Sequence, residues 1–335
     1  MVPLSVLDLA PIVQGGDAGS SLRQSLTLAR HAERLGYRRF WMAEHHSMPG
    51  IASSATSVAL AHVAAGTETI RVGAGGIMLP NHSPLVIAEQ FGTLAALHPG
   101  RIDLGLGRAP GGDPYTARAL RKDPVEAADR FPHDVVELMR YFEPGDATRR
   151  VRAIPGEGED VPIWILGSSL FGARLAAALG LPYAFASHFA PAQLGPAIEI
   201  YRREFEPSAQ LERPYLMVAA NIFAADTSEE AHLLQSSLVQ AFLALRRGAP
   251  VQLPPPDPEL ALDANDMAML QQTLRYTFAG TGPEVREKLA TFAERTGADE
   301  VIVTSQVFDP EARLRSFELV APSEPGVAQS AGSTR

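Results

Sequence analysis

Residues 32–46 (AERLGYRRFWMAEHH), 177–189 (AALGLPYAFASHF) and 293–308 (AERTGADEVIVTSQVF) follow one pattern at three places in the chain. In each, a helix with an apolar face ends at a glycine, and an apolar strand follows within a few residues and ends in polar side chains. Glycine ends helices readily because it adopts the left-handed conformation without steric cost. The repeated unit of helix and strand indicates an α/β protein.

Apolar stretches elsewhere in the chain predict five further strands, with helical patterns between them. They lie at residues 4–9, 70–76, 101–106, 162–166 and 215–224. Together with the three strands of the repeated unit they give eight strands that alternate with helices, which predicts a closed (β/α)8 TIM barrel. An open, doubly wound sheet fits the same pattern and stays the alternative.

Two segments interrupt this alternation. Residues 247–262 contain three consecutive prolines at 254–256, which exclude a helix or a central strand there. We interpret 247–270 as a mobile lid, inserted before the last barrel unit. Residues 322–335 are small and polar and are predicted to be a disordered tail. The chain is therefore expected to be one domain over residues 1–321.

The composition excludes several functions. With 335 residues, 46% of them hydrophobic, the chain can bury its core without a disulfide or a metal. It has no cysteine, so thiolate nucleophiles and cysteine-ligated metals are excluded. The net charge of −9, without a basic block, argues against nucleic acid and anionic membranes as partners. Neither a signal peptide nor a long apolar run is recognisable, so we expect the cytoplasm.

In a TIM barrel, the polar residues at the carboxyl ends of the strands line the active site. Here they include no Ser-His-Asp arrangement and no carboxylate pair of catalytic spacing, which argues against hydrolysis by the protein's own groups. The candidates are Glu44, His45, His46, Gly75, Gly76, Gly107, Arg108, Gly167, Ser168, Ser169, Ser187, His188, Asn221, Ser305 and Gln306.

Arg108, Ser168 and Ser169 form a candidate anion site. The two serines begin a predicted helix, where free backbone N–H groups and the helix dipole favour a phosphate. Alternatively, Ser168 only caps the helix and Arg108 makes a surface ion pair. The glycines of residues 105–111 (GLGRAPG) do not have the dinucleotide spacing, and a loop follows where the fingerprint needs a helix, so no nicotinamide site is predicted.

The cluster of Glu44, His45 and His46 has three interpretations. Adjacent residues of a strand point to opposite sides, so at most one histidine enters the barrel mouth. A metal site would need His82 or His188 as well, and nothing has metal-ligand spacing, so none is predicted. Proton transfer or hydrogen bonding beside a cofactor is favoured, and a structural pair is the alternative.

Three stretches in combination resemble the bacterial luciferase-like flavin-dependent monooxygenases, and most closely their single-chain branch of unassigned substrate. They are residues 40–46 (FWMAEHH), 70–112 (IRVGAGGIMLPNHSPLVIAEQFGTLAALHPGRIDLGLGRAPGG) and 162–189 (PIWILGSSLFGARLAAALGLPYAFASHF). The resemblance runs from about residue 4 to 319, except for 247–270. It implies a (β/α)8 barrel that binds FMN at the carboxyl ends of its strands.

The resemblance also implies roles for single residues. His45 would lie near the reactive edge of the flavin and support its reaction with oxygen, with Glu44 in the same cofactor site. Gly75 and Gly76 match a cis peptide that lies against the flavin ring. The phosphate would contact Arg108 and the segment of Gly167, Ser168 and Ser169. Luciferase itself has cysteine, glutamate and threonine in place of Gly107, Ser168 and Gly172, which argues against light emission and long-chain aldehyde specificity.

The activity implied is that of a two-component monooxygenase. A separate NAD(P)H-dependent flavin reductase would supply reduced FMN, O2 would form a flavin hydroperoxide, and an aldehyde, ketone or aromatic substrate would be oxygenated. A homodimer through the helices after strands two and three, including residues 52–65, is expected by the same resemblance. The alternatives are a deazaflavin-dependent dehydrogenase on this fold, a non-catalytic flavin-binding protein and a metal-dependent barrel hydrolase.

Overall fold

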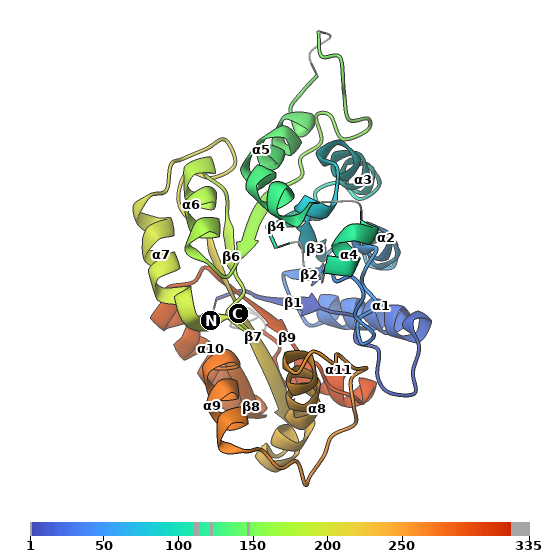
Figure 1. Cartoon of the computed structure of the whole chain (residues 1–335), viewed down its shortest axis with the longest axis vertical. Helices are drawn as coiled ribbons and strands as arrows, with labels where there is room; N and C mark the ends of the chain where they lie inside the picture. The colour runs from blue at the N-terminus through green and yellow to red at the C-terminus, as the bar shows by residue number, and fades with distance from the viewer. Residues whose placement is uncertain (1, 110–113, 121–122, 146–147, 323–335) are drawn as a thin grey trace, which may run out of the picture.

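The computed structural model describes residues 2–109, 114–120, 123–145 and 148–322, so the predicted disordered tail lies almost entirely outside the described residues. Strands and helices alternate along the chain (Figure 1). The strands are β1 (Leu4–Asp8), β2 (Arg39–Met42), β3 (Arg71–Met78), β4 (Ile102–Gly107), β5 (Ile163–Gly167), β6 (Tyr183–Phe185), β7 (Leu216–Ala225), β8 (Thr277–Thr281) and β9 (Glu300–Thr304). The helices are α1 (Ala18–Arg34), α2 (Thr56–Ala65), α3 (Pro84–Leu97), α4 (Pro114–Ala119), α5 (Pro124–Phe142), α6 (Leu170–Leu179), α7 (Leu194–Arg203), α8 (Ser228–Arg246), α9 (Ala264–Thr273), α10 (Gly282–Thr296) and α11 (Pro310–Val320), with short 3-10 turns η1 (Leu79–Asn81) and η2 (Pro191–Gln193).

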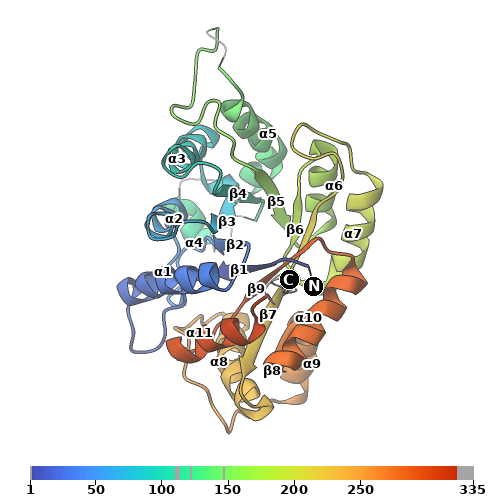
Figure 2. The ribbon, with the colours of Figure 1, turned by 180° about the vertical axis from the view of Figure 1, so that it is seen from behind.

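Eight parallel strands close into a barrel. Strands β1 to β6 pair in chain order, β6 pairs with β7, and β9 joins β7 to β1. The pairing of β6 with β7 closes the ring, which confirms the predicted TIM barrel and excludes the open sheet. The helices lie outside the strands when the molecule is seen from either side (Figures 1 and 2). The carboxyl ends of all eight strands therefore meet at one mouth.

A ninth strand, which the sequence did not predict, extends one side of this mouth. β7 is ten residues long; its first half pairs with β6 and β9, and its second half, from Asn221 to Ala225, pairs with β8. β8 thus lies beyond the end of the short strand β6. Because β6 has only three residues, an edge of β7 would otherwise stay unpaired above it.

The segment 247–270, interpreted as a mobile lid, contains the start of a helix. Residues 264–273 form helix α9, which begins at Asp263 with a side-chain cap to the Asp266 N–H. The proline-containing part has no helix, as predicted, but Leu253 is buried and pairs with Val13. A contact with a distant residue and a capped helix thus give the segment a defined structure. Its role as a lid stays a prediction.

Paired charges fill the amino-terminal end of the barrel. The guanidinium of Arg39 donates to Asp103 at 2.7 Å and to Glu300 at 3.0 Å, and all three side chains are buried. The Trp41 indole N–H also donates to Asp103, and Arg39 lies 4.9 Å from the centre of the Trp164 ring. Every charge in this layer has a partner, as burial requires. Since these charges are satisfied by one another, we expect the functional site at the opposite, carboxyl-terminal end of the barrel.

Close contact between β3 and β4 yields a first prediction. A Cβ atom on Gly105 would overlap the backbone oxygen of Ala74, whereas a Cβ on Gly107, two residues along the same strand, would meet nothing nearer than 3.8 Å. We expect Gly105→Ala to lower the free energy of unfolding by about 2 kcal/mol and Gly107→Ala to leave it nearly unchanged. Urea denaturation of the two variants measures the difference, and equal stability would contradict the packing described.

Candidate functional site

A buried carboxylate joins two loops of the mouth. Glu44 lies just after β2, and its Oε1 is 2.6 Å from Nε2 of His46 and 2.8 Å from Nε2 of His82. Its Oε2 accepts the backbone N–H of Met78 at 3.0 Å. Burial alone would raise the pKa of Glu44, but the bonds from His82, Met78 and His46 outweigh it and lower the pKa. The ionised carboxylate thus ties the loop after β2 to the segment after β3.

The same cluster has the composition of a metal site. One donor atom each from Glu44, His46 and His82 lies within 4.8 Å of the others, a set that zinc and similar cations accept. His82 therefore joins the cluster, as the metal interpretation required, although no spacing in the sequence indicated it. Since an ionised carboxylate only accepts hydrogen bonds, both imidazoles donate their Nε2 protons to it here. The arrangement needs no cation to satisfy these atoms.

Two further histidines follow the ends of strands, His45 after β2 and His188 after β6. The Nδ1 atoms of His45 and His188 are both buried and have no hydrogen-bond partner among the residues that the structure describes. Burial, and to a lesser extent His45, lowers the pKa of His188 to about 3. Burial also lowers the pKa of His45, and Glu44 only partly opposes this. Both imidazoles are therefore neutral near pH 7. β2 ends at Met42, so His45 and His46 lie in the loop that follows it and the alternation of a strand does not apply to them. That at most one of them enters the mouth stays a prediction.

The backbone of β3 is irregular at Gly75 and Gly76. The peptide bond between Gly75 and Gly76 is cis, as the family resemblance predicted, and the register of β3 against β4 shifts between Ala74 and Ile77. A Cβ on Gly76 would lie 2.7 Å from the carbonyl oxygen of Gly105, and one on Gly75 would lie 2.7 Å from Leu7. Both positions therefore accept only glycine without movement of a neighbour, which explains the residue type there.

An anion-binding corner lies between β4 and α6. The exposed guanidinium of Arg108 lies over the ring of Phe171, 4.1 Å from its centre, so it is held beside the first turn of α6. Ser169 is the residue that caps this helix, and its side chain makes no capping bond. The alternative that Ser168 caps the helix was therefore wrong. Arg108 forms no ion pair among the described residues, so its charge and the first N–H groups of α6 are available to a phosphate.

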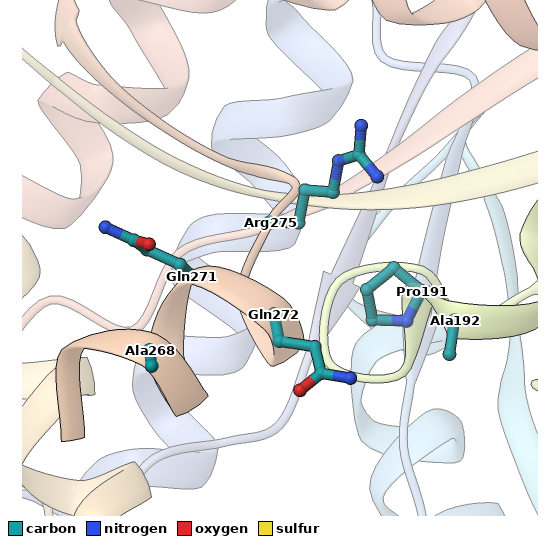
Figure 3. Close-up of a pocket in the computed structure, with 6 residues that line it drawn as sticks. All are labelled: Pro191, Ala192, Ala268, Gln271, Gln272 and Arg275. Atoms are coloured by element: carbon teal, nitrogen blue, oxygen red, sulfur yellow. The ribbon is translucent and has the colours of Figure 1, made fainter. Parts of the chain in front are cut away.

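A cavity of about 580 Å³ lies between η2 and α9, close to the end of β6 (Figure 3). The carboxamide of Gln272 extends toward Pro191 and Ala192, and Gln271 points away from them (Figure 3). Half of the lining residues come from α9, and one of them, Ala268, lies in the segment 247–270 that was interpreted as a lid. Local sequence could not predict this cavity, because residues about 80 positions apart form it. It is lined by Pro191, Ala192, Ala268, Gln271, Gln272 and Arg275.

The fold and the mouth define a (β/α)8-barrel protein with an exposed arginine beside a helix start and neutral histidines after its strands. The chain belongs to the luciferase-like monooxygenase family, whose model matches residues 2–300. It is 53% identical to a luciferase-like monooxygenase of Escherichia coli K12, over 95% of this chain and 96% of that protein.

Solved structures agree on the architecture. Apo-MsnO8 is 36% identical, with a TM-score of 0.84 over 96% of this chain and 98% of that one. The oxygenating constituent of a Pseudomonas putida 3,6-diketocamphane monooxygenase, in complex with FMN, shares the fold at 18% identity, with a TM-score of 0.69 over 96% and 97% of the two chains.

The structure thus brings the predicted site residues to one mouth in two groups. Glu44, His45, Gly75 and Gly76 lie on the side of β2 and β3, and Arg108, Gly167, Ser168 and Ser169 lie at the ends of β4 and β5. Their contacts with a cofactor stay predictions. The oxygen atoms of Glu44 are already hydrogen bonded, so its predicted cofactor contact would have to form beside these bonds. Within the described residues, no helix is long and apolar enough to span a membrane.

Proposed function

We propose that this protein is the oxygenase component of a two-component monooxygenase that uses reduced FMN and O2 to oxygenate a small aldehyde, ketone or aromatic substrate. One observation carries the proposal. The mouth has a corner suited to a phosphate, formed by Arg108 and α6, and an imidazole, His45, whose buried Nδ1 has no partner in the part of the chain that the structure describes. Membership of the luciferase-like monooxygenase family supports the same activity.

The residues of the mouth fit FMN. The Arg108 guanidinium, the hydroxyls of Ser168 and Ser169 and the first N–H groups of α6 would hold the phosphate. The paired glycines, Gly75 and Gly76, would let the backbone approach the flat ring closely, because no side chain stands between. When bound, reduced FMN supplies the electrons that activate O2.

The protein's own residues then position and protect the reactants. The neutral imidazole of His45 can hold a proton at one nitrogen and accept one at the other, so it can move a proton at the reacting edge of the cofactor. The bonds of Glu44 to His46 and His82 fix the loop that carries His45. The segment 247–270, which contributes Ala268 to the cavity beside η2, would exclude water when it closes as a lid.

The proposal includes two partners. An NAD(P)H-dependent flavin reductase would supply the reduced FMN, since the sequence has no nicotinamide fingerprint. A second copy of the chain would pack against α2, which is rich in small residues and exposes 69% of Val58. We expect the protein to form a homodimer in solution. We also expect it to work in the cytoplasm.

A cofactor titration tests the proposal. The purified protein is titrated with oxidised FMN, anaerobically reduced FMN and a reduced deazaflavin, and air is then admitted with a panel of candidate substrates. We expect the tightest binding for reduced FMN and an oxygenated product that carries one atom from labelled O2. Tightest binding of the deazaflavin would favour the dehydrogenase alternative. FMN binding without any product would favour the non-catalytic alternative, and a stoichiometric bound metal would favour the hydrolase.

A further inference from the structure

Glu44 is the one buried carboxylate without an arginine beside it among those that the structure describes. Its side chain is 1% exposed, and its ion pairs within the described residues are with His46 and His82. An imidazole carries a positive charge only when it is protonated, whereas a guanidinium always does. The hydrogen bonds of Glu44 satisfy its oxygen atoms, but they leave its buried charge without the permanent cation that burial favours. The four other buried carboxylates each lie within 3.5 Å of an arginine nitrogen, and they are Asp8, Asp103, Asp134 and Glu300.

The donor atoms around this carboxylate converge on one point. Nε2 of His46 lies 2.6 Å from Oε1 of Glu44, and Nε2 of His82 lies 2.8 Å from the same oxygen. The ring centres of the two histidines are 6.5 Å apart and their planes are inclined at 45°, so the imidazoles approach this oxygen from two directions. The two histidine side chains are 17% and 28% exposed, which leaves the cluster open to solvent on the side of the rings.

One carboxylate oxygen and two imidazole nitrogens are a donor set for transition-metal ions. Zn²⁺ accepts two histidines and a glutamate with a fourth position open, whereas Mg²⁺ and Ca²⁺ require mainly oxygen. Tetrahedral Zn²⁺ with bonds of about 2.0–2.1 Å holds its ligand atoms about 3.3–3.4 Å apart, so each imidazole has to withdraw from Oε1 by less than about 1 Å. Oε2 of Glu44 accepts the Met78 N–H at 3.0 Å, and this bond can hold the carboxylate in place as a ligand.

We propose that Glu44, His46 and His82 form a binding site for one divalent transition-metal ion of the Zn²⁺ type. The ion would link the loop after β2 to the segment after β3. Two of its three ligands flank His45 in the chain, so it would hold the backbone on both sides of that residue. The inference does not depend on the proposed function, because it assigns the ion no part in oxygenation.

The ion cannot bind a protonated nitrogen, so its binding changes the tautomer of both rings. Without it, Nε2 of His46 and Nε2 of His82 carry the protons that are donated to Glu44. When the ion binds, the hydrogen bond from each Nε2 to Glu44 breaks, a bond from Nε2 to the ion forms, and solvent carries the proton to Nδ1 of the same ring. Both rings stay neutral and no net proton is released. A cluster with a purely structural role would not show this change.

Calorimetry measures the site directly. The full chain, without a histidine tag and without FMN, is freed of metal with a chelator and titrated with Zn²⁺. We expect one ion per chain. His46→Asn and His82→Asn should each weaken binding at least about 100-fold, because loss of a group that only orients a ligand already costs about 10- to 100-fold. The matched control is His232→Asn, at an exposed position of α8, which should change nothing. Mg²⁺ should not compete.

Nitrogen-15 NMR of the histidine-labelled chain gives a second readout and needs no variant of the buried Glu44. Zn²⁺ should move the proton from Nε2 to Nδ1 in two histidines, whose signals are assigned with His46→Asn and His82→Asn. The metal content before chelation is recorded separately, since the hydrolase alternative requires an ion that stays bound through purification. Absence of Zn²⁺ binding, binding that both variants leave unchanged, or equal competition by Mg²⁺ would overturn the inference. Because FMN is absent throughout, none of these results bears on the proposed function.

Discussion

Replacement of His45 by Ala is expected to lower the amount of substrate oxygenated per FMN oxidised by about 100-fold, with FMN affinity changed less than about twofold. The side chain sits at the mouth with a buried, unpartnered Nδ1, and it makes no contact with the phosphate corner at Arg108 among the described residues. Without it, electrons from FMN should reach O2 but not substrate, so hydrogen peroxide should accumulate. Product and peroxide are measured together, after single additions of reduced FMN.

The pH dependence sharpens this prediction. Burial lowers the pKa of His45 below its ordinary value of 6.5, so the imidazole is neutral at every pH above that value. The fraction of FMN oxidation that yields product should therefore be constant between about pH 7 and about pH 9. His45→Gln, which keeps a hydrogen-bonding group but cannot move a proton, separates the two possible tasks of the residue. Full activity in His45→Ala would show that His45 has neither task.

Replacement of Arg108 by Ala should weaken FMN binding by roughly 30- to 150-fold, which corresponds to about 2–3 kcal/mol for a charge-assisted bond to phosphate. The guanidinium is exposed, lies over Phe171 and forms no ion pair among the described residues, so a bound phosphate would be its main charged partner. Arg108→Lys keeps the charge and loses the planar stacking on the ring, so its affinity should be intermediate.

Riboflavin provides the matched control for this position, since it lacks the phosphate and keeps the flavin ring. Its affinity should be the same in the unmodified protein and in Arg108→Ala. The flavin fluorescence measured during each titration gives all of these constants. An equal loss of affinity for riboflavin and FMN would mean that Arg108 supports the mouth as a whole and does not contact the phosphate.

Local sequence was sufficient to predict the barrel. The apolar stretches, the glycines that end α6 and α10 in the left-handed conformation, and the polar strand ends depend only on neighbouring residues. The anion corner was predictable for the same reason, because Ser168 and Ser169 stand at a helix start. The motif of Glu44, His45 and His46 predicted that these residues lie at the barrel mouth. It could not predict which neighbour each histidine contacts.

The strand β8 was not predictable in this way. Its residues are partly exposed and its pairing partner on β7 lies more than fifty positions earlier in the chain. In the proline-containing region, the pairing of Leu253 with the distant Val13 was likewise not predictable. Tertiary contacts decided the structure at both places. Helix α9, which follows, has a local signal that the sequence analysis missed, because Asp263 caps it.

The sequence by itself thus determined the eight-stranded barrel, the end of it that carries the polar residues and the place of the cis peptide, because each follows from the local pattern or from the resemblance of continuous motifs. Only the tertiary structure decided that Glu44 binds His82 as well as His46. The contact with His82 joins segments that follow different strands, and the pairing of β2 with β3 brings them together. A linear pattern holds no information about which side chains of such segments meet.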